Sequence, residues 1–596
     1  MKKAKVAVVV AIAASLGLAA CSSSTKAGGG GSTPSIATSS IQKQYEAEDP
    51  TLKPPAADVP GAKKGGTITV LSQSTPNSFD PTDIYYTDSN EIAKLIYRTP
   101  TQFEIVQSGP DAGKATLVPD LMDLGTPSAD GLTWTFKFLY PGKVKYQDGT
   151  PVTIQDFEYA VERSFAHDLF PDGPTYQLTY FKGASTYKFT PGTVDTNAPM
   201  VSVQGNDTLI INLSQKFSDL PYYLTFPVFT PIPASKDTDP ANYQKNPETT
   251  GPYKVDSLAL GSELKLSKNS YWDPNTDPVR HQYADAFDFK WGGDDVTSQN
   301  AILAGATPVD QTSIDYGNID SSLVAKVTNG GPNVSQLVTG DSPCTIVMQL
   351  DTRKIPLDVR KAIAIAYPSD QIYQAGGGSP LTEEPASTIL PPSVPGYNKY
   401  TPYPGLTGTG TGDPAAAKQM LQAWEKANNK TSFTVSWYYD NTQTIAQQVN
   451  QIRTQALQQA GFTVKAIGVT TADLRSKTAD YSAPVNMGQS PAGWCSDWPT
   501  GGSWFPVLFE SSSLKAGLSW GMMSDPTLDA QINAVGDLPA DQQPAAWGKL
   551  DQQIMGQYVV IPRYYDKAAI VEGTGLGGDV IDSTVGMPDF LNMYVK

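Results

Sequence analysis

The sequence predicts an α/β protein with more than one domain or lobe. The first observation is a strand, helix and strand pattern within residues 433–467, because such a unit implies a parallel sheet covered by helices. The second is the length of 596 residues, which exceeds the size of one domain. The third is an apolar content of 39%, which is ample for several packed cores.

The N-terminal segment has the pattern of an export signal. Residues 1–5 are cationic, and residues 6–20 are apolar but too short to span a bilayer comfortably. Residues 1–20 are therefore predicted to be a cleaved signal peptide. The run Leu18-Ala19-Ala20-Cys21 resembles a bacterial lipobox, in which the cysteine is lipidated, so Cys21 is the predicted lipidation site. Ordinary secretion, with cleavage after a small residue, is the alternative.

Residues 21–65 are predicted to form a flexible linker behind the lipid anchor. The segment is rich in Gly, Ser, Thr, Pro and Lys, includes four consecutive glycines at 28–31, and has no apolar period. A flexible coil of this length spans on average roughly 35 to 40 Å. Such a linker would hold a folded body away from a membrane.

The folded part is predicted to begin with a strand over residues 66–71, where apolar and β-branched residues are enriched. A second strand is expected within residues 131–139, because bulky aromatic residues alternate along it. Thr153, with Asp156 three residues later, has the pattern of a capping box, so a helix is predicted to begin there.

A β-α-β unit is predicted further along the chain. Residues 433–439 alternate as a strand, residues 442–460 carry apolar side chains at helical intervals, and residues 462–467 have the composition of another strand. Gly461 suits the left-handed end of the helix between them. This unit predicts a second α/β lobe.

Cysteine usage agrees with export. Besides Cys21 the chain contains only Cys344 and Cys495, and thiols in an oxidising compartment tend to pair. A disulfide between these two residues is therefore a candidate, with two buried free thiols as the alternative.

Charge and motif content exclude several functions. A formal net charge of −16 argues against nucleic acid or an anionic membrane surface as a partner. The two histidines, His167 and His281, have no Cys or His near them at ligand spacing, which disfavours a zinc site or a catalytic triad. The glycines at 573–578 match a dinucleotide fingerprint by letter, but only 18 residues follow them, without a helix pattern. We expect no cofactor, no metal and no enzyme activity; a surface hydrolase with buried carboxylates is the enzymatic alternative.

The segment from Trp134 to Arg163 carries a specific resemblance. Residues 134–139, residues 145–153 and the Asp156-Phe157 pair look like the signature of the family 5 extracellular solute-binding proteins, the oligopeptide, dipeptide and nickel receptors of ABC importers. Further matches cover nearly the whole chain: Gly251–Val255, Ala301–Gly305, Pro356–Ala366 and Asp413–Lys418.

The resemblance implies a two-lobed periplasmic-binding-protein-like fold of type II, in the large cluster that has an extra subdomain, with a hinge between the lobes. On this basis lobe I is predicted at 66–340, with the extra subdomain at about 96–200. Lobe II is predicted at 341–555, and residues 556–596 are predicted to return to lobe I.

The ligand site is implied by two segments around the cysteines. Residues 342–345 and 493–498 resemble segments of the oligopeptide-binding branch, in which the matching cysteines are disulfide-bonded and the matching aspartate binds the ligand's ammonium group. The resemblance thus implies a bond between Cys344 and Cys495, and Asp497 as the ammonium ligand. The chemistry agrees, because a carboxylate in a closed cleft is costly unless it is paired. A turn or capping role is the alternative for Asp497.

Aromatic and acidic neighbours complete the predicted site. Trp494 and Trp498 are predicted to shield Asp497 from water, with plain core packing as the alternative. Tyr85, Tyr86 and Asp88 lie in a segment that in family members faces the cleft beside the ligand, and surface packing is the alternative for them.

The predicted function is ligand capture for import. We expect a monomeric, lipid-anchored substrate-binding protein on the extracytoplasmic face of the bacterial cell membrane. It would close its lobes on an oligopeptide and deliver it to an ABC permease and, through it, to the ATPase subunits. An oligosaccharide is the alternative ligand, because 29 Tyr and 10 Trp offer stacking faces.

Overall fold

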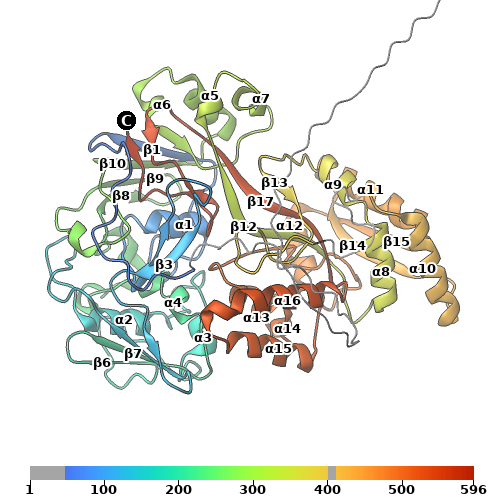
Figure 1. Cartoon of the computed structure of the whole chain (residues 1–596), viewed down its shortest axis with the longest axis horizontal. Helices are drawn as coiled ribbons and strands as arrows, with labels where there is room; N and C mark the ends of the chain where they lie inside the picture. Colours follow the sequence, from blue (N-terminus) through green and yellow to red (C-terminus); the bar gives the residue numbers. More distant parts are fainter. Residues whose placement is uncertain (1–46, 401–410) are drawn as a thin grey trace, which may run out of the picture. The chain divides into compact units, whose positions relative to one another are not determined.

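The computed structural model describes residues 47–400 and 411–596. The predicted signal peptide and Cys21 lie outside the described residues. The fold is α/β, as the sequence predicts, with one large mixed sheet, several small sheets and helices distributed around them (Figure 1).

The large sheet has the strand order β16-β12-β17-β11-β1-β10-β9-β8, and β13 also pairs with β17. β1 runs parallel to β10 and β11, and the other pairs are antiparallel. β1 confirms the strand predicted at 66–71. The strands are β1 (Thr67–Ser72), β8 (Tyr253–Ala259), β9 (Glu263–Lys268), β10 (Ala286–Trp291), β11 (Ser313–Asp315), β12 (Leu337–Gln349), β13 (Glu383–Pro385), β16 (Gly493–Cys495) and β17 (Val560–Glu572).

β12 and β17 are the longest strands, with 13 residues each, and they run side by side (Figure 1). Their register shifts between Asp341 and Thr345 and again between Ile346 and Val347, so the pairing is irregular in this part of both strands. One half lies near β11 and the other near β16. The lobe boundary predicted at 340/341 falls within β12, and the one at 555/556 falls just before β17.

Two small antiparallel sheets are formed by residues 101–212, a range that extends beyond the end predicted for the extra subdomain at about residue 200. One is formed by β2 (Thr101–Ile105) and β3 (Ala115–Pro119), and the other has the order β4-β5-β7-β6. Trp134, Phe136 and Phe138 are buried, in agreement with the predicted alternation. The strands of the second sheet are β4 (Thr126–Pro127), β5 (Thr133–Lys137), β6 (Val201–Gln204) and β7 (Thr208–Asn212).

The helix predicted at Thr153 is α2 (Ile154–Arg163), and the capping box between Thr153 and Asp156 is present. The box confirms the prediction, because each side chain accepts a hydrogen bond from the other residue's backbone N–H at the open helix end.

The predicted β-α-β unit is also confirmed. β14 (Thr434–Asp440) and β15 (Thr463–Val469) pair in parallel, and α11 (Thr444–Gln459) connects them. Gly461 has a φ of +89°, as expected for the residue that ends the helix. α10 (Pro414–Ala427) begins at Asp413, whose carboxylate accepts from the N–H of Ala416.

The remaining helices and strands are short or peripheral to the site. They are α1 (Thr87–Ala93), α3 (Tyr176–Tyr180), α4 (Leu220–Tyr223), α5 (Asp295–Ala304), α6 (Pro308–Gln311), α7 (Val324–Val327), α8 (Leu357–Ala366), α9 (Ser369–Ala375), α12 (Thr471–Ala479), α13 (Phe505–Phe509), α14 (Ser513–Ala516), α15 (Pro526–Gly536), α16 (Gln543–Met555), β18 (Leu576–Gly577), β19 (Ile581–Asp582), β20 (Met587–Pro588) and β21 (Tyr594–Val595).

Residues 47–65 correct the predicted linker. The sequence predicts a flexible segment up to residue 65, but the structure holds these residues on the body. The N–H of Asp49 donates to the carbonyl of Leu117, and the N–H of Ala56 donates to the carbonyl of Asp277. A proline-rich segment lacks an apolar period yet can still run extended along a surface and pair its remaining backbone groups. The linker prediction is therefore wrong for residues 47–65.

Within residues 47–400 and 411–596, none of the helices combines the length and the apolar character that crossing a bilayer requires.

Candidate ligand-binding site

The predicted disulfide is confirmed. Cys344 on β12 lies directly opposite Cys495 on β16, and their sulfur atoms are 2.04 Å apart. Both cysteines line a cavity of about 530 Å³. The bond therefore fixes β16, and the residues that follow it, to one of the two long strands at the wall of this cavity.

Three separate segments supply most of the other walls of the cavity. Tyr86 and Asp88, at the start of α1, line it, and Tyr86 is exposed. Burial raises the pKa of Asp88. The other lining residues are Ser74, Thr75, Asn77, Thr87, Asp172, Tyr316, Ser342, Val585, Gly586 and Met587.

Asp497 lies two residues after β16, where two phenols meet its carboxylate. The hydroxyl of Tyr176, from α3, donates to Oδ2 of Asp497, and the hydroxyl of Tyr85 also hydrogen-bonds to this carboxylate. Burial raises the pKa of Asp497 to about 6, although both hydrogen bonds act in the opposite direction. Among the described residues no cation forms an ion pair with Asp497. The site thus combines a partly buried negative charge with neutral donors and lacks a positive partner of its own.

The two tyrosines are neutral donors held by the surrounding aromatic rings. Burial raises the pKa of both Tyr85 and Tyr176, and the nearby charge of Asp497 adds to the effect. The ring of Tyr85 lies 6.1 Å from that of Phe226, and the ring of Tyr176 lies 5.2 Å from that of Tyr223. Because the phenols stay neutral at neutral pH, they donate hydrogen bonds to the Asp497 carboxylate and add no charge to the site.

A buried ionic cluster holds the segment that carries Tyr85. Arg163, at the end of α2, pairs with Asp80 at 2.6 Å and with Asp237 at 2.8 Å, and all three side chains are almost fully buried. Asp80 lies five residues before Tyr85, and its carboxylate also accepts from the N–H of Thr82. The cluster therefore fixes the backbone from which Tyr85 reaches Asp497.

Trp498 is fully buried in an aromatic cluster, which we define as Trp498 with Tyr176, Phe217, Tyr223 and Phe226. The ring centroids of Trp498 and Tyr176 are 4.7 Å apart. The indole N–H of Trp498 donates to Asp219 at 2.7 Å. Trp498 thus packs behind Tyr176 and supports one of the donors to Asp497.

Trp494 lies outside the aromatic cluster around Trp498. Its indole N–H donates to the carbonyl of Ser503 at 2.9 Å, and its ring packs against the core that contains Trp504 and Phe505. Neither tryptophan lines the 530 Å³ cavity. A ligand contact for either side chain stays a prediction, as it does for Tyr85, Tyr86, Asp88 and Asp497.

A smaller cavity of about 270 Å³ shares Tyr316, Ser342 and Gly586 with the first one and extends the cleft. Glu383 on β13 and Asp566 on β17 lie opposite each other in its lining. Burial, and then the charge of Glu383, raise the pKa of Asp566 to about 6. The cleft is therefore predominantly acidic along its length.

Tyr176 was missed by the sequence analysis. It follows a loop of glycine and prolines, and no alternation or helical period distinguishes it from the other tyrosines of the chain. The signal that identifies it is spatial, because its partner Asp497 lies 321 residues away.

The family model and the relatives with similar sequences are all bacterial binding proteins. The model of the family described as "Bacterial extracellular solute-binding proteins, family 5 Middle" matches residues 116–515. The periplasmic oligopeptide-binding protein OppA of Salmonella typhimurium is 23% identical over 482 residues, which cover 78% of this chain and 82% of OppA. The glutathione-binding protein GsiB of Escherichia coli is 25% identical over 468 residues, which cover 75% and 80% of the two chains.

Solved structures agree on the fold. The structure titled "Clavulanic acid biosynthesis oligopeptide binding protein 2" superimposes with a TM-score of 0.79 at 23% identity, over 92% of this chain and 99% of the other. An unliganded, open form of the periplasmic murein tripeptide-binding protein MppA gives a TM-score of 0.68 at 17% identity, over 90% and 98%. These similarities show the two-lobed binding-protein fold. Because the family model matches more than half of the chain, the chain belongs to family 5 of the bacterial extracellular solute-binding proteins.

Proposed function

We propose that this protein is the lipid-anchored substrate-binding component of an ABC importer and that it captures oligopeptides. The observation that carries the proposal is Asp497, a partly buried carboxylate that receives two phenol hydrogen bonds and no cation among the described residues. A peptide's α-ammonium group supplies both the missing charge and the missing donors. The relatives named above are binding proteins rather than enzymes, which supports binding without turnover.

The rest of the peptide is proposed to lie along β16. Among the described strands, β16 is the last in the order of the large sheet and pairs with β12 alone, so its outer edge is proposed to accept an added strand. Asp497 lies two residues after this strand. A peptide that runs antiparallel to β16 would therefore bring its amino end close to the carboxylate.

The proposal is tested with the purified protein lacking residues 1–21. Native mass spectrometry of the sample, followed by release of bound ligand, is expected to identify co-purified peptides. Calorimetry then compares one of these peptides with its N-acetylated form. The acetylated peptide is expected to bind at least 30-fold more weakly, because acetylation removes the charge that faces Asp497. Equal affinities for the two forms would refute the role of Asp497.

An oligosaccharide is the second candidate, and the exposed Tyr86 beside the cavity favours it by offering a ring for stacking. A neutral sugar carries no ammonium group. Replacement of Asp497 by Asn would then leave affinity nearly unchanged, whereas replacement of Tyr86 by Ala would weaken it. Asp497→Asn is therefore the variant that distinguishes the two ligand classes, because a loss of affinity in it is expected for a peptide and not for a neutral sugar.

Anchoring and delivery form the last part of the proposal. Cys21 is proposed to carry the lipid that holds the protein on the extracytoplasmic face of the bacterial cell membrane, where a permease and its ATPase subunits accept the ligand. Mass spectrometry of the mature N-terminus is expected to show a lipidated Cys21. The Cys21→Ala variant is expected to lose the lipid and to appear in the soluble fraction.

A further inference from the structure

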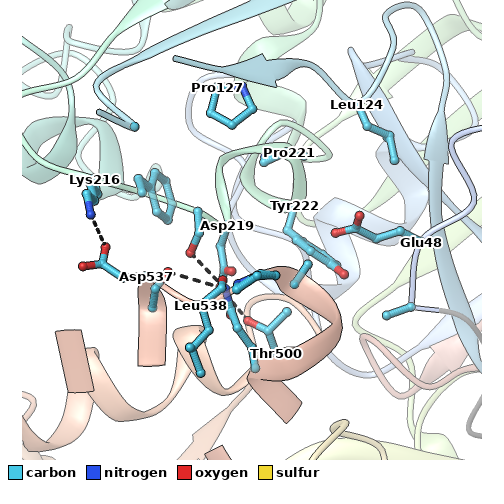
Figure 2. Close-up of a pocket in the computed structure, with 18 of the residues that line it drawn as sticks. Glu48, Leu124, Pro127, Lys216, Asp219, Pro221, Tyr222, Thr500, Asp537 and Leu538 are labelled. Carbon is cyan, nitrogen blue, oxygen red and sulfur yellow. Dashed lines mark hydrogen bonds and ion pairs between the residues drawn. The ribbon is translucent and has the colours of Figure 1, made fainter. Parts of the chain in front are cut away.

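A second cavity, of about 580 Å³, shares no lining residue with the cleft described above. Its walls come from two groups of segments that are far apart in the sequence (Figure 2). Residues 47–50, 124–134 and 216–222 supply one group. Residues 499–501 and 536–547 supply most of the other. Its volume lies in the range of cavities that bind small molecules.

Most of the cavity wall is apolar. Leu124, Phe217 and Leu538 contribute side chains, and several prolines contribute flat surfaces without an N–H group. An apolar or aromatic group fits such a wall, because its burial releases water without leaving a polar group unpaired. The prolines are Pro50, Pro127, Pro221, Pro395, Pro499, Pro539 and Pro544.

Two buried donors in the lining lack acceptors. Trp134 is 8% exposed and Trp547 is 1% exposed, and both side chains line the cavity. Neither indole N–H has a hydrogen-bond acceptor among the described residues. A buried donor without an acceptor is costly, and such groups are rare in proteins. Both nitrogen atoms are shielded from solvent, so the two rings add apolar surface to the wall and no hydrogen-bond donor.

Two carboxylates in the lining also lack a cation. Glu48 lies beside Tyr222 with its carboxylate turned towards the cavity (Figure 2). Burial, together with the charge of Asp219, raises the pKa of Glu48, although a hydrogen bond with Tyr222 acts in the opposite direction. Lys216 is already paired with Asp537 at 2.9 Å, and no ion pair within the described residues involves Glu48 or Asp219. Negative charge in this cavity is thus left without a counter-charge.

We propose that this cavity is a second binding site, for a small amphipathic amine with an aromatic body and an ammonium group. The aromatic body lies against the proline-rich wall, and the ammonium group faces Glu48. This site is separate from the peptide cleft and does not depend on the function proposed for it.

The site is linked to Asp497 by a chain of contacts. Asp219, in the cavity wall, accepts from the indole N–H of Trp498 at 2.7 Å and from the hydroxyl of Thr500 at 2.5 Å. Trp498 packs against Tyr176, and Tyr176 donates to Asp497. The cavity thus lies on the other side of the aromatic cluster that supports Asp497, and it has no contact with Asp497 itself.

Tyramine is a suitable probe, because it carries an aromatic ring and an ammonium group. 4-Ethylphenol is the matched control, since it keeps the ring and the hydroxyl of tyramine and lacks the amine. Calorimetry and saturation-transfer NMR are carried out on the protein lacking residues 1–21, on Glu48→Gln and on Asp497→Asn. A cooperative urea-unfolding transition of Glu48→Gln, like that of wild type, shows that this variant is folded.

Saturable tyramine binding is expected, with 4-ethylphenol at least tenfold weaker. Glu48→Gln is expected to weaken tyramine at least tenfold, and Asp497→Asn is expected to change it less than twofold. Absence of tyramine binding would overturn the proposal. So would equal binding by Glu48→Gln and wild type, or loss of binding in Asp497→Asn, because the amine would then occupy the cleft.

Discussion

Replacement of Asp497 by Asn removes the charge of the proposed ammonium site and keeps the size of the side chain. Burial raises the pKa of this residue from 3.8 to about 6. A difference of about 2 in pKa corresponds to about 3 kcal/mol, at 1.36 kcal/mol for each pKa unit. This free energy is the cost of holding the carboxylate ionised in the empty site, and the uncharged side chain of Asn does not incur that cost.

The sign of the pH dependence follows from the direction of this shift. Because the pKa is raised in the folded state, the folded protein binds the proton more tightly than the unfolded chain does. The cost is relieved as the pH falls through about 6, and it is fully present above that pH. The empty Asp497→Asn variant is therefore expected to be more stable than wild type by up to about 3 kcal/mol at pH 7.5. The two proteins should converge near pH 4.

Peptide binding, in contrast to the stability of the empty protein, should favour the wild type over the variant. A peptide ammonium stabilises the ionised carboxylate, and loss of one partner from such a pair costs about 2 to 5 kcal/mol. The variant is therefore expected to bind a free peptide at least 30-fold more weakly than wild type, and an N-acetylated peptide with nearly equal affinity.

Urea denaturation of the empty proteins at pH 4, 5.5 and 7.5 measures the first effect, and calorimetry at pH 7.5 measures the second. Asp172→Asn is a control for the loss of a carboxylate, because Asp172 is exposed and lines the 530 Å³ cavity, whereas Asp497 lies outside the lining of that cavity. It should change neither stability nor peptide affinity by more than twofold in the corresponding equilibrium constant. A stability difference between wild type and Asp497→Asn that does not vary with pH would refute the reasoning from burial.

Replacement of both Cys344 and Cys495 by Ser opens a loop with a sequence separation of 151 residues, so urea denaturation should show a loss of stability of up to about 5 kcal/mol. A smaller loss than about 1 kcal/mol would contradict the loop-closure argument. Trp498→Phe leaves Asp219 with one donor fewer, and a loss of about 1 to 3 kcal/mol is expected in the same assay; unchanged stability would mean that water replaces the indole. Thr153→Ala removes the cap of α2, and a loss of about 1 kcal/mol is expected by thermal unfolding, with Thr153→Ser as the control that retains it.

Elements whose signals are local were predictable. The capping box at Thr153 and the Asp413 cap of α10 each depend on residues within one helical turn, so the sequence alone contains the cause. The β-α-β unit was predictable for the same reason, since its periodicities persist over whole elements. The disulfide needed the family resemblance as well, because parity alone left free thiols open.

The residues that depend on distant contacts were not predictable in the same way. Tyr176 gains its role from Asp497, and Trp498 gains its own from Asp219, which is 279 residues away. No pattern within either segment encodes these pairs. The segment 47–65 failed for a related reason. Its proline-rich composition excludes regular elements but does not reveal that Leu117 and Asp277 offer hydrogen-bond acceptors to it.

The position of Trp498 has an optical consequence. Its indole is shielded from water, surrounded by the rings of Tyr176, Phe217, Tyr223 and Phe226, and close to a carboxylate. A shielded indole emits at shorter wavelength than a hydrated one, so withdrawal of this side chain from the cluster shifts its fluorescence to the red. Subtraction of the Trp498→Phe spectrum isolates this signal from the other tryptophans. The intrinsic fluorescence of Trp498 thus reports, without an added dye, on the place where the segment after β16 meets the rest of the fold.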